Sequence, residues 1–205
     1  MKNLINFKSI LIPSLGLAGL LLFATSCSEN KTTDSMEVAE QENISKLTND
    51  DRTAVVIDND NDAQFLMDAA EMQMEEISLG KLAQQKGNSP HVKELGKMME
   101  EDHSKSLSEL KALAQSKSVS IPASVTEDSR DAYKSLNEET GNDFGKAYTD
   151  MMVEHHEDAI ELYEKAATDS EDPKIRAYAT EKLPGLRTHL QHAEAAKEKS
   201  DNIKS

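Results

Sequence analysis

Four segments of the chain, each about 25 residues long, carry apolar side chains at alternating steps of three and four residues. That spacing places the apolar side chains on one face of an α-helix, so each segment predicts an amphipathic helix with one stripe to bury. Such a helix is stable in water chiefly when its stripe packs against other apolar surfaces. The pattern therefore predicts an all-α fold, a four-helix bundle, with helices at about 62–86, 90–116, 143–168 and 173–199.

A shorter amphipathic helix is expected at about 127–138, within the long connection between the second and third segments. This connection either crosses the length of the bundle or packs across one end, and the sequence leaves both arrangements open. The composition agrees with an all-helical chain, because only 4% of the residues are aromatic and Trp is absent from the sequence.

Residues with strong positional preferences mark the ends of these helices. Ser89–Pro90 and Asp172–Pro173 are pairs of a capping residue and a first-turn proline. Asp143 is expected to cap the third long helix. Pro184 lies inside the last stripe, where it removes a backbone donor, so we expect a kink or an interrupted turn near Leu183.

The first 27 residues predict a bacterial lipoprotein signal peptide. A basic start is followed by a mostly apolar run, Ile10–Ala24, and the chain then reads "ATSC" up to Cys27. The apolar run is short for a transmembrane helix. Cys27 is the only cysteine, so it cannot form an internal disulfide, and we expect it to carry the lipid that anchors the protein to a membrane. An ordinary signal peptide or anchor with an incidental cysteine is the alternative.

The rest of the chain divides into three parts. Residues 28–61 are polar and acidic and predict a disordered spacer, 62–199 are expected to form the helical domain, and 200–205 a tail. The formal net charge of −15 repels nucleic acid, so we expect no nucleic-acid partner. No particular protein partner is indicated. We expect the protein in the bacterial cell envelope, lipid-anchored at the outer membrane or the periplasmic face.

Each long helix carries one residue of a metal-ligand type on its otherwise apolar stripe. These residues are Glu76, His103, His156 or its neighbour His155, and His189. They lie at similar distances from the starts of their helices, so the four side chains can meet in one layer of an antiparallel bundle. Burying them without partners is unfavourable. One transition-metal ion (zinc, copper, iron or manganese) would satisfy them, because imidazole and carboxylate groups are good ligands for these metals.

Two acids near His103 extend this candidate site. Glu100 and Asp102 are expected to donate a further ligand or to hydrogen-bond the ligands from outside. The alternative to a metal site is a metal-free network in which Asp102 and Glu76 bond the histidines and water.

The other chemically active side chains predict no additional site. His91 and His192 lie near helix ends and are expected to be exposed, and the methionines have core spacing. Neither a serine or cysteine nucleophile arrangement nor a glycine-rich phosphate loop is readable in the sequence, so we predict no catalytic residues.

Three stretches resemble the domain of unknown function 4142 family of bacterial envelope proteins. They span 62–114, 143–167 and 172–193, and their most specific pieces are "MMEEDHS" and "LPGLRTHL". The resemblance covers essentially all of 62–196 and implies a ferritin-like four-helix fold. It aligns the family pattern with Glu76, Asp102, His103, His156 and His189, and so implies His156 rather than His155. The family has no established reaction, so the resemblance implies a fold and not an activity.

The chain departs from the di-iron ferritins, which use two Glu-x-x-His pairs. Glu100–His103 has that spacing once, but the residues three before the other two histidines are Val153 and Leu186. A single histidine-rich site is therefore more compatible with the chain than a two-metal oxidase.

These observations predict a membrane-tethered, non-enzymatic helical bundle of the cell envelope that binds one transition metal and acts in envelope stress or metal handling. Two alternatives stay open. One is a metal-dependent oxidoreductase such as a peroxide scavenger, and the other is a structural interaction module whose buried polar layer sets the register of the helices.

Overall fold

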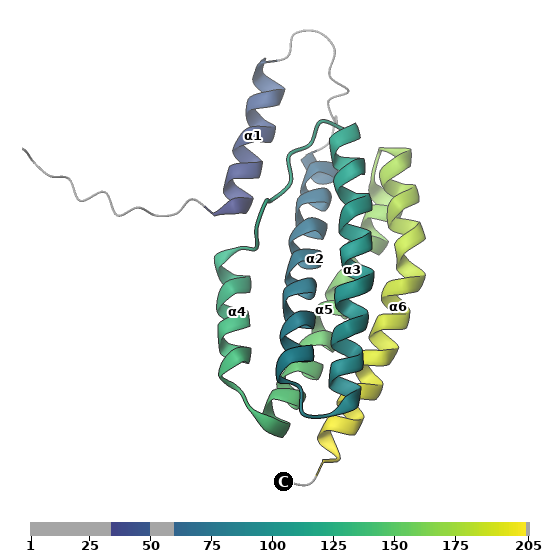
Figure 1. The fold of residues 1–205 in the computed structure, drawn as a ribbon. Helices are drawn as coiled ribbons and strands as arrows, with labels where there is room; N and C mark the ends of the chain where they lie inside the picture. The colour runs from purple at the N-terminus through teal and green to yellow at the C-terminus, as the bar shows by residue number, and fades with distance from the viewer. Residues whose placement is uncertain (1–33, 50–59, 204–205) are drawn as a thin grey trace, which may run out of the picture. The chain divides into compact units, whose positions relative to one another are not determined.

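The computed structural model describes residues 34–49 and 60–203, and this part of the chain is all-α (Figure 1). No strand occurs within these residues. Six helices are present there: α1 (Ser35–Asn49), α2 (Asp60–Lys86), α3 (Pro90–Ser116), α4 (Glu127–Glu138), α5 (Gly141–Asp169) and α6 (Pro173–Asp201). The bounds of the five predicted helices agree with these to within about two residues at each end.

Four of the helices, α2, α3, α5 and α6, are long and lie side by side (Figure 1). Short turns join α2 to α3 and α5 to α6, and each of these pairs packs along its length. The two pairs meet where α2 contacts α5 and α3 contacts α6. The backbones of α2 and α3 approach closely, because a Cβ placed on Gly80 would lie 2.6 Å from the carbonyl oxygen of Gly96. Side chains from all four helices therefore share one interior.

The interior consists of two hydrophobic clusters. The first is built around Leu66, Leu110, Tyr163, Ile175 and Tyr178. The second is built around Leu79, Met99, Phe144, Tyr148 and Met152. Along each long helix, the histidine or glutamate on the stripe falls between members of the two clusters. A polar layer therefore separates the two halves of the core.

The connection between α3 and α5 contains α4, which packs against α2 and α5. Glu71 of α2 fixes the start of α4, because its Oε1 accepts hydrogen bonds from the Thr126 backbone N–H, the Thr126 hydroxyl and the Ser129 hydroxyl at 2.7–2.8 Å. Thr126 in turn caps the helix by accepting from the Ser129 backbone N–H. This connection thus runs along the long helices and adds the buried Leu136 of α4 to the second cluster.

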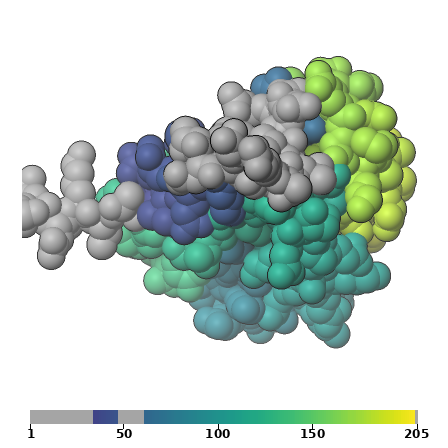
Figure 2. Space-filling view, turned by 90° about the horizontal axis from the view of Figure 1, so that it is seen from above, coloured from purple at the N-terminus to yellow at the C-terminus, as the bar shows by residue number. Residues whose placement is uncertain are grey.

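A helix occupies part of the segment for which disorder was expected. Within 28–61, residues Ser35–Asn49 form α1, and this corrects the prediction of a spacer without structure. The Asn43 side chain donates to the Ser120 carbonyl at 2.9 Å and accepts from the Ser120 backbone N–H at 2.7 Å. Lys46 also bonds this connection, and Ala39 is buried. Figure 2 shows α1, in purple, against the green and teal atoms of the chain that follows α3.

The structure corrects the predicted start of the third long helix and decides one of the two alternatives predicted at Pro184. Helix α5 begins at Gly141 after the N-cap Thr140, so Asp143 lies in the first turn and is not the cap. Gly141 has a φ of 58°, a left-handed conformation that glycine adopts easily, and this allows the helix to start earlier. A kink or an interrupted turn was expected near Leu183; helix α6 is continuous through Pro184, so the turn is not interrupted. Packing of the buried Leu183 and Leu186 on either side compensates for the one missing backbone donor.

The predicted signal peptide and the lipid-carrying Cys27 lie outside the described residues. Among the helices that are described, none combines the length and the apolar character that crossing a membrane requires. The expected tail begins later than predicted, because α6 continues to Asp201 and buries Ser200.

Candidate metal centre

The polar layer between the two hydrophobic clusters is formed by one side chain from each long helix. Glu76 of α2, His103 of α3, His156 of α5 and His189 of α6 are 3%, 5%, 1% and 7% exposed. Each stands at a stripe position, where the helix period directs it inward with its apolar neighbours. The layer is thus a direct consequence of four apolar stripes that each contain one polar residue.

The three histidines form a nearly equilateral triangle. The centroid of the His103 ring lies 5.5 Å from that of His156 and 5.2 Å from that of His189, and the last two lie 5.4 Å apart. One ring nitrogen of each lies within 4.8 Å of the others. With metal–nitrogen bonds of about 2.0–2.1 Å, the ring centroids lie about 3.2 Å from the ion, so tetrahedral bonding separates them by about 5.2 Å. The spacing of the rings therefore suits a first-row metal ion at their centre.

Hydrogen bonds set the direction in which two of the histidines present their lone pairs. His156 Nδ1 lies 2.8 Å from the carbonyl oxygen of Met152, which can only accept, so the proton is on Nδ1 and the lone pair is on Nε2. His189 Nε2 lies 2.9 Å from Asp102 Oδ2, which places its lone pair on Nδ1. Both lone-pair nitrogens are buried and have no hydrogen-bond partner among the described residues.

Two histidines of the triangle, His103 and His156, are held in the form that binds metals. Burial lowers the pKa of His103 to about 4 and outweighs the nearby carboxylate of Glu76. Burial also lowers the pKa of His156. These two imidazoles are therefore neutral at pH 7, and a neutral imidazole is the species that coordinates a metal. The Nε2 atom of His103, like the two nitrogens above, is buried without a partner in the described part of the chain.

Glu76 lies beside the triangle and faces a fourth histidine. Its Oε1 lies 3.1 Å from His155 Nδ1 and 4.0 Å from His156 Nδ1. Burial alone would raise the pKa of Glu76, but the hydrogen bond from His155 and the surrounding imidazoles lower it overall. The same contact raises the pKa of His155 against the opposing effect of burial. Glu76 is therefore an anion, and its Oε2 is buried with no partner that the described residues supply.

His155 has a role that the stripe pattern did not assign. The sequence left His155 and His156 as alternatives for one position, whereas the structure uses both side chains. His156 is inside the layer, and His155, whose side chain is 23% exposed, holds Glu76 from the outer edge. The adjacent pair of histidines was the signal for this arrangement, since consecutive residues on a helix diverge by about 100° and so reach different partners.

The two acids near His103 behave differently. Asp102 accepts the hydrogen bond from His189, so it contacts the site from outside as expected. Glu100 does not join the site, because its Oε2 accepts from Gln84 of α2 at 2.6 Å and its Oε1 lies 3.8 Å from Lys81.

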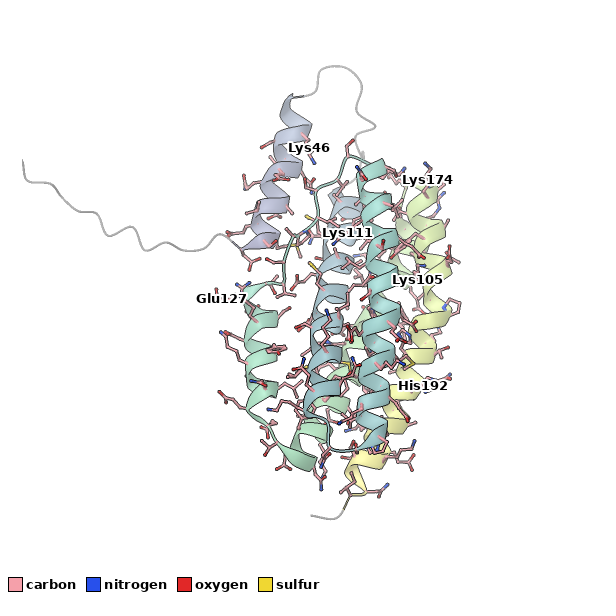
Figure 3. All side chains as sticks on the ribbon, viewed as in Figure 1. Lys46, Lys105, Lys111, Glu127, Lys174 and His192 are labelled. Carbon is pink, nitrogen blue, oxygen red and sulfur yellow. The ribbon has the colours of Figure 1, made fainter. Side chains whose placement is uncertain are left out.

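The remaining histidines lie away from the layer. His192 is exposed on α6, as predicted (Figure 3). His91 is half-buried and its Nε2 lies 3.0 Å from the Ser200 hydroxyl, so the expectation that it is exposed was wrong. Several methionines, including Met99 and Met152, are core residues.

A cavity of about 440 Å³ borders the layer. The four side chains of the layer contribute to its wall, together with Gln73, Ser106, Tyr163 and several charged residues, among them Lys105, which Figure 3 labels on α3. The four side chains of the layer therefore border a space large enough for a small molecule.

Comparison with curated proteins gave no significant match. Among solved structures, the chain is similar to one described as "Crystal structure of DUF305 fragment from Deinococcus radiodurans". The TM-score is 0.60 at 11% sequence identity, over 69% of this chain and 97% of the other, so the similarity concerns the fold alone. The profile of the family described as "Domain of unknown function (DUF4142)" matches residues 35–196. The chain therefore belongs to the DUF4142 family.

Proposed function

We propose that this protein is a ferritin-like four-helix bundle that binds one divalent transition-metal ion in its core, through His103, His156, His189 and Glu76. One observation carries the proposal. Ligand atoms of His103, His156 and His189 lie within 4.8 Å of one another, and the described residues supply no hydrogen-bond partner to one buried nitrogen of each ring or to Oε2 of the neighbouring Glu76.

A metal-free network would have to satisfy the acceptors of this layer with water and the N–H of His103. His156 Nε2, His189 Nδ1 and Glu76 Oε2 are all acceptors, so they cannot hydrogen-bond to one another. Each buried and unsatisfied polar atom costs about 1–3 kcal/mol. A cation satisfies all of them at once and also balances the charge of Glu76. A donor set of three imidazole nitrogens and one carboxylate oxygen suits zinc, copper, iron or manganese.

Metal content tests the proposal directly. The chain is purified in detergent without a polyhistidine tag, stripped with a chelator, equilibrated with Zn²⁺, desalted and analysed for metal. We expect about one ion per chain in the wild type, and none in His103→Ala or His189→Ala. His192→Ala is the matched control, since it removes an exposed imidazole from the same helix as His189, and it should retain the ion. Retention of metal in both site variants, or its absence from the wild type, would refute metal binding here.

We further propose that the protein works at a membrane of the bacterial cell envelope, in metal handling or envelope stress, tethered through a lipid on Cys27. The basic start, the apolar run and the "ATSC" sequence support this proposal. Several acyl chains, each contributing about 0.8 kcal/mol per buried methylene group, would anchor the domain stably. Cys27→Ser should shift the protein from the membrane fraction to the soluble fraction; an unchanged distribution would exclude the lipid anchor.

The cavity beside the imidazoles favours one second function, a metal-dependent oxidoreductase such as a peroxide scavenger. An enzyme of this kind would consume hydrogen peroxide when loaded with a redox-active metal and would lose that turnover on chelation and in His103→Ala. Full metal loading without turnover would leave binding as the function.

A further inference from the structure

The cavity extends one helical turn beyond the layer of ligands. Its wall includes one residue three positions from each layer residue on the same helix, and three positions are close to one turn. These residues are Gln73, Ser106, Ala159 and Leu186. The metal layer is therefore bordered by a second layer that lines the same space.

Gln73 is the one member of this second layer that is both polar and buried. It is 3% exposed. Its Nε2 donates to the Tyr163 hydroxyl at 3.1 Å and to the Tyr178 hydroxyl at 3.4 Å. Tyr178 donates its own proton to the Ser106 carbonyl at 3.2 Å, so its oxygen is free to accept from Gln73. The tyrosines therefore hold the NH₂ end of the amide.

The carbonyl end of the Gln73 amide has no comparable partner. Gln73 Oε1 is buried, and no hydrogen bond to it is made by any residue that the structure describes. A buried acceptor without a hydrogen bond is destabilising, and a donor that bonds to it removes this cost. Since Gln73 lines the cavity, the donor can be a molecule that enters this space.

The cavity limits what that molecule can be. Its volume of about 440 Å³ is an order of magnitude larger than the roughly 30 Å³ share of one water in the liquid. Five carboxylates line the cavity against two lysines, Lys105 and Lys182, and Lys182 is already paired with Glu109. The carboxylates are those of Glu75, Glu76, Asp102, Glu109 and Asp158, so acids still outnumber bases when one divalent ion is bound. An anion is therefore disfavoured, and a small neutral molecule fits best.

We infer that the metal centre takes a small neutral ligand that coordinates the ion through one lone-pair atom and donates an N–H or O–H hydrogen bond to Gln73 Oε1. This inference rests on the proposed metal binding. The metals that suit the site accept additional ligands, since zinc expands to five-coordination and copper, iron and manganese take more than four ligands. The cavity borders both the histidines of the layer and Gln73, so one ligand in it can lie next to both.

Imidazole and 1-methylimidazole are matched probes for this site. Both are neutral at about pH 8 and offer a lone-pair nitrogen to the metal, but only imidazole has an N–H on the far side of its ring. The chain is loaded with Co²⁺, whose visible absorption changes when its coordination number changes, and is titrated with each probe. We expect imidazole to bind about tenfold more tightly than 1-methylimidazole, because one probe satisfies the buried acceptor and the other does not.

Substitution of the acceptor should remove this preference. In Gln73→Met, which keeps the length of the side chain, the two probes should bind with equal affinity. In Gln64→Met, which changes an exposed glutamine of the same helix, the tenfold preference should persist. The two-probe comparison in the wild type does not depend on how well a variant folds.

The possible failures are distinguishable. If Co²⁺ binds at one per chain and neither probe changes its spectrum, or if both probes bind the wild type equally, the ligand site is refuted and metal binding stands. If the preference survives in Gln73→Met, the role of Gln73 is refuted. If Co²⁺ does not bind, the metal centre and the ligand site both fall.

Discussion

Asp102, a residue at the surface, selects the tautomer of His189, a residue in the core. Its side chain is 59% exposed, yet it accepts a hydrogen bond from the buried His189 across the contact between α3 and α6. This bond selects the tautomer whose lone pair is on the buried Nδ1. Partners of this kind orient metal-binding histidines and increase their basicity.

Removing this partner should weaken the site without removing a ligand. We expect Asp102→Ala to bind Zn²⁺ about 10- to 100-fold more weakly than the wild type, measured by competition with a coloured chelator. Asp102→Asn keeps an acceptor oxygen and should lose less, and Glu101→Ala changes an exposed neighbour and should lose nothing. Equal affinity in Asp102→Ala and the wild type would show that the bond to His189 does not serve metal binding.

The sequence predicted which residues form the layer better than it predicted their partners. A stripe position specifies that a side chain points inward, and this was sufficient for Glu76, His103 and His189. It could not separate the inward His156 from His155, because an offset of one residue on a helix leaves both near the interior. The expectation for Glu100 failed since Gln84 and Lys81 of the neighbouring helix bind it, and such contacts depend on how two helices are registered.

Asp172 combines a helix cap with an ion pair, and its effect on stability should depend on pH. Burial tends to raise its pKa, but Lys117 and the backbone N–H groups of Lys174 and Ile175 lower it overall. Because the pKa of Asp172 is lower in the folded protein, its carboxylate stabilises the fold fully at any pH above its unfolded-state pKa of about 3.9. This stabilisation is lost as the pH falls through the lower folded-state pKa.

We expect Asp172→Ala to lower the free energy of unfolding at pH 7 by about 2 kcal/mol, because both the cap and the pair are lost. Asp172→Asn keeps a capping oxygen and should lose about half of that. Urea denaturation across the pH range measures both. The deficit of Asp172→Asn should disappear in acid, and a deficit that stays constant down to the lowest pH would contradict the role of the charge.

At the level of whole elements, periodicity located five helices but not α1. The five predicted helices each have a stripe that buries, whereas α1 is fixed largely by hydrogen bonds to a connection more than 70 residues away. The hydrogen bonds between Asn43 and the backbone of Ser120 join residues far apart in the chain, so they produce no hydrophobic periodicity in the local sequence. The polar composition of this segment therefore predicted disorder where residues Ser35–Asn49 form a helix.

The close approach of α2 and α3 gives a test at the same scale. Gly80→Ala places a methyl group 2.6 Å from the Gly96 carbonyl oxygen and 3.0 Å from the Glu100 backbone nitrogen, so the helices must separate. We expect a loss of about 1–3 kcal/mol in stability from this overpacking, even though alanine favours helices. Gly185→Ala is the control, because nothing lies within 4 Å of its new Cβ, and it should gain up to about 1 kcal/mol. Equal effects of the two substitutions, measured by urea denaturation, would contradict the tight crossing.

At the scale of the whole molecule, the polar layer joins two hydrophobic clusters and all four long helices. An ion bound there connects every long helix, so binding should stabilise the entire fold. Zn²⁺ at a hundredfold excess over its dissociation constant should add about 2.7 kcal/mol, which raises the Tm by roughly 5–10 °C for a protein of this size. The same addition should leave the Tm of His103→Ala unchanged in a thermal scan. A Tm of the wild type that responds to neither Zn²⁺ nor chelator would identify the layer as a purely structural network.

Anomalous diffraction at the absorption edge of the bound metal tests the central claim most directly, since it locates the ion rather than its consequences. Crystals of the Zn²⁺-loaded protein should give a single strong peak inside the helices, about 2.0–2.2 Å from His103 Nε2, His156 Nε2, His189 Nδ1 and a carboxylate oxygen of Glu76. Peaks confined to surface carboxylates, with the three imidazoles bonded only to water or to one another, would contradict it.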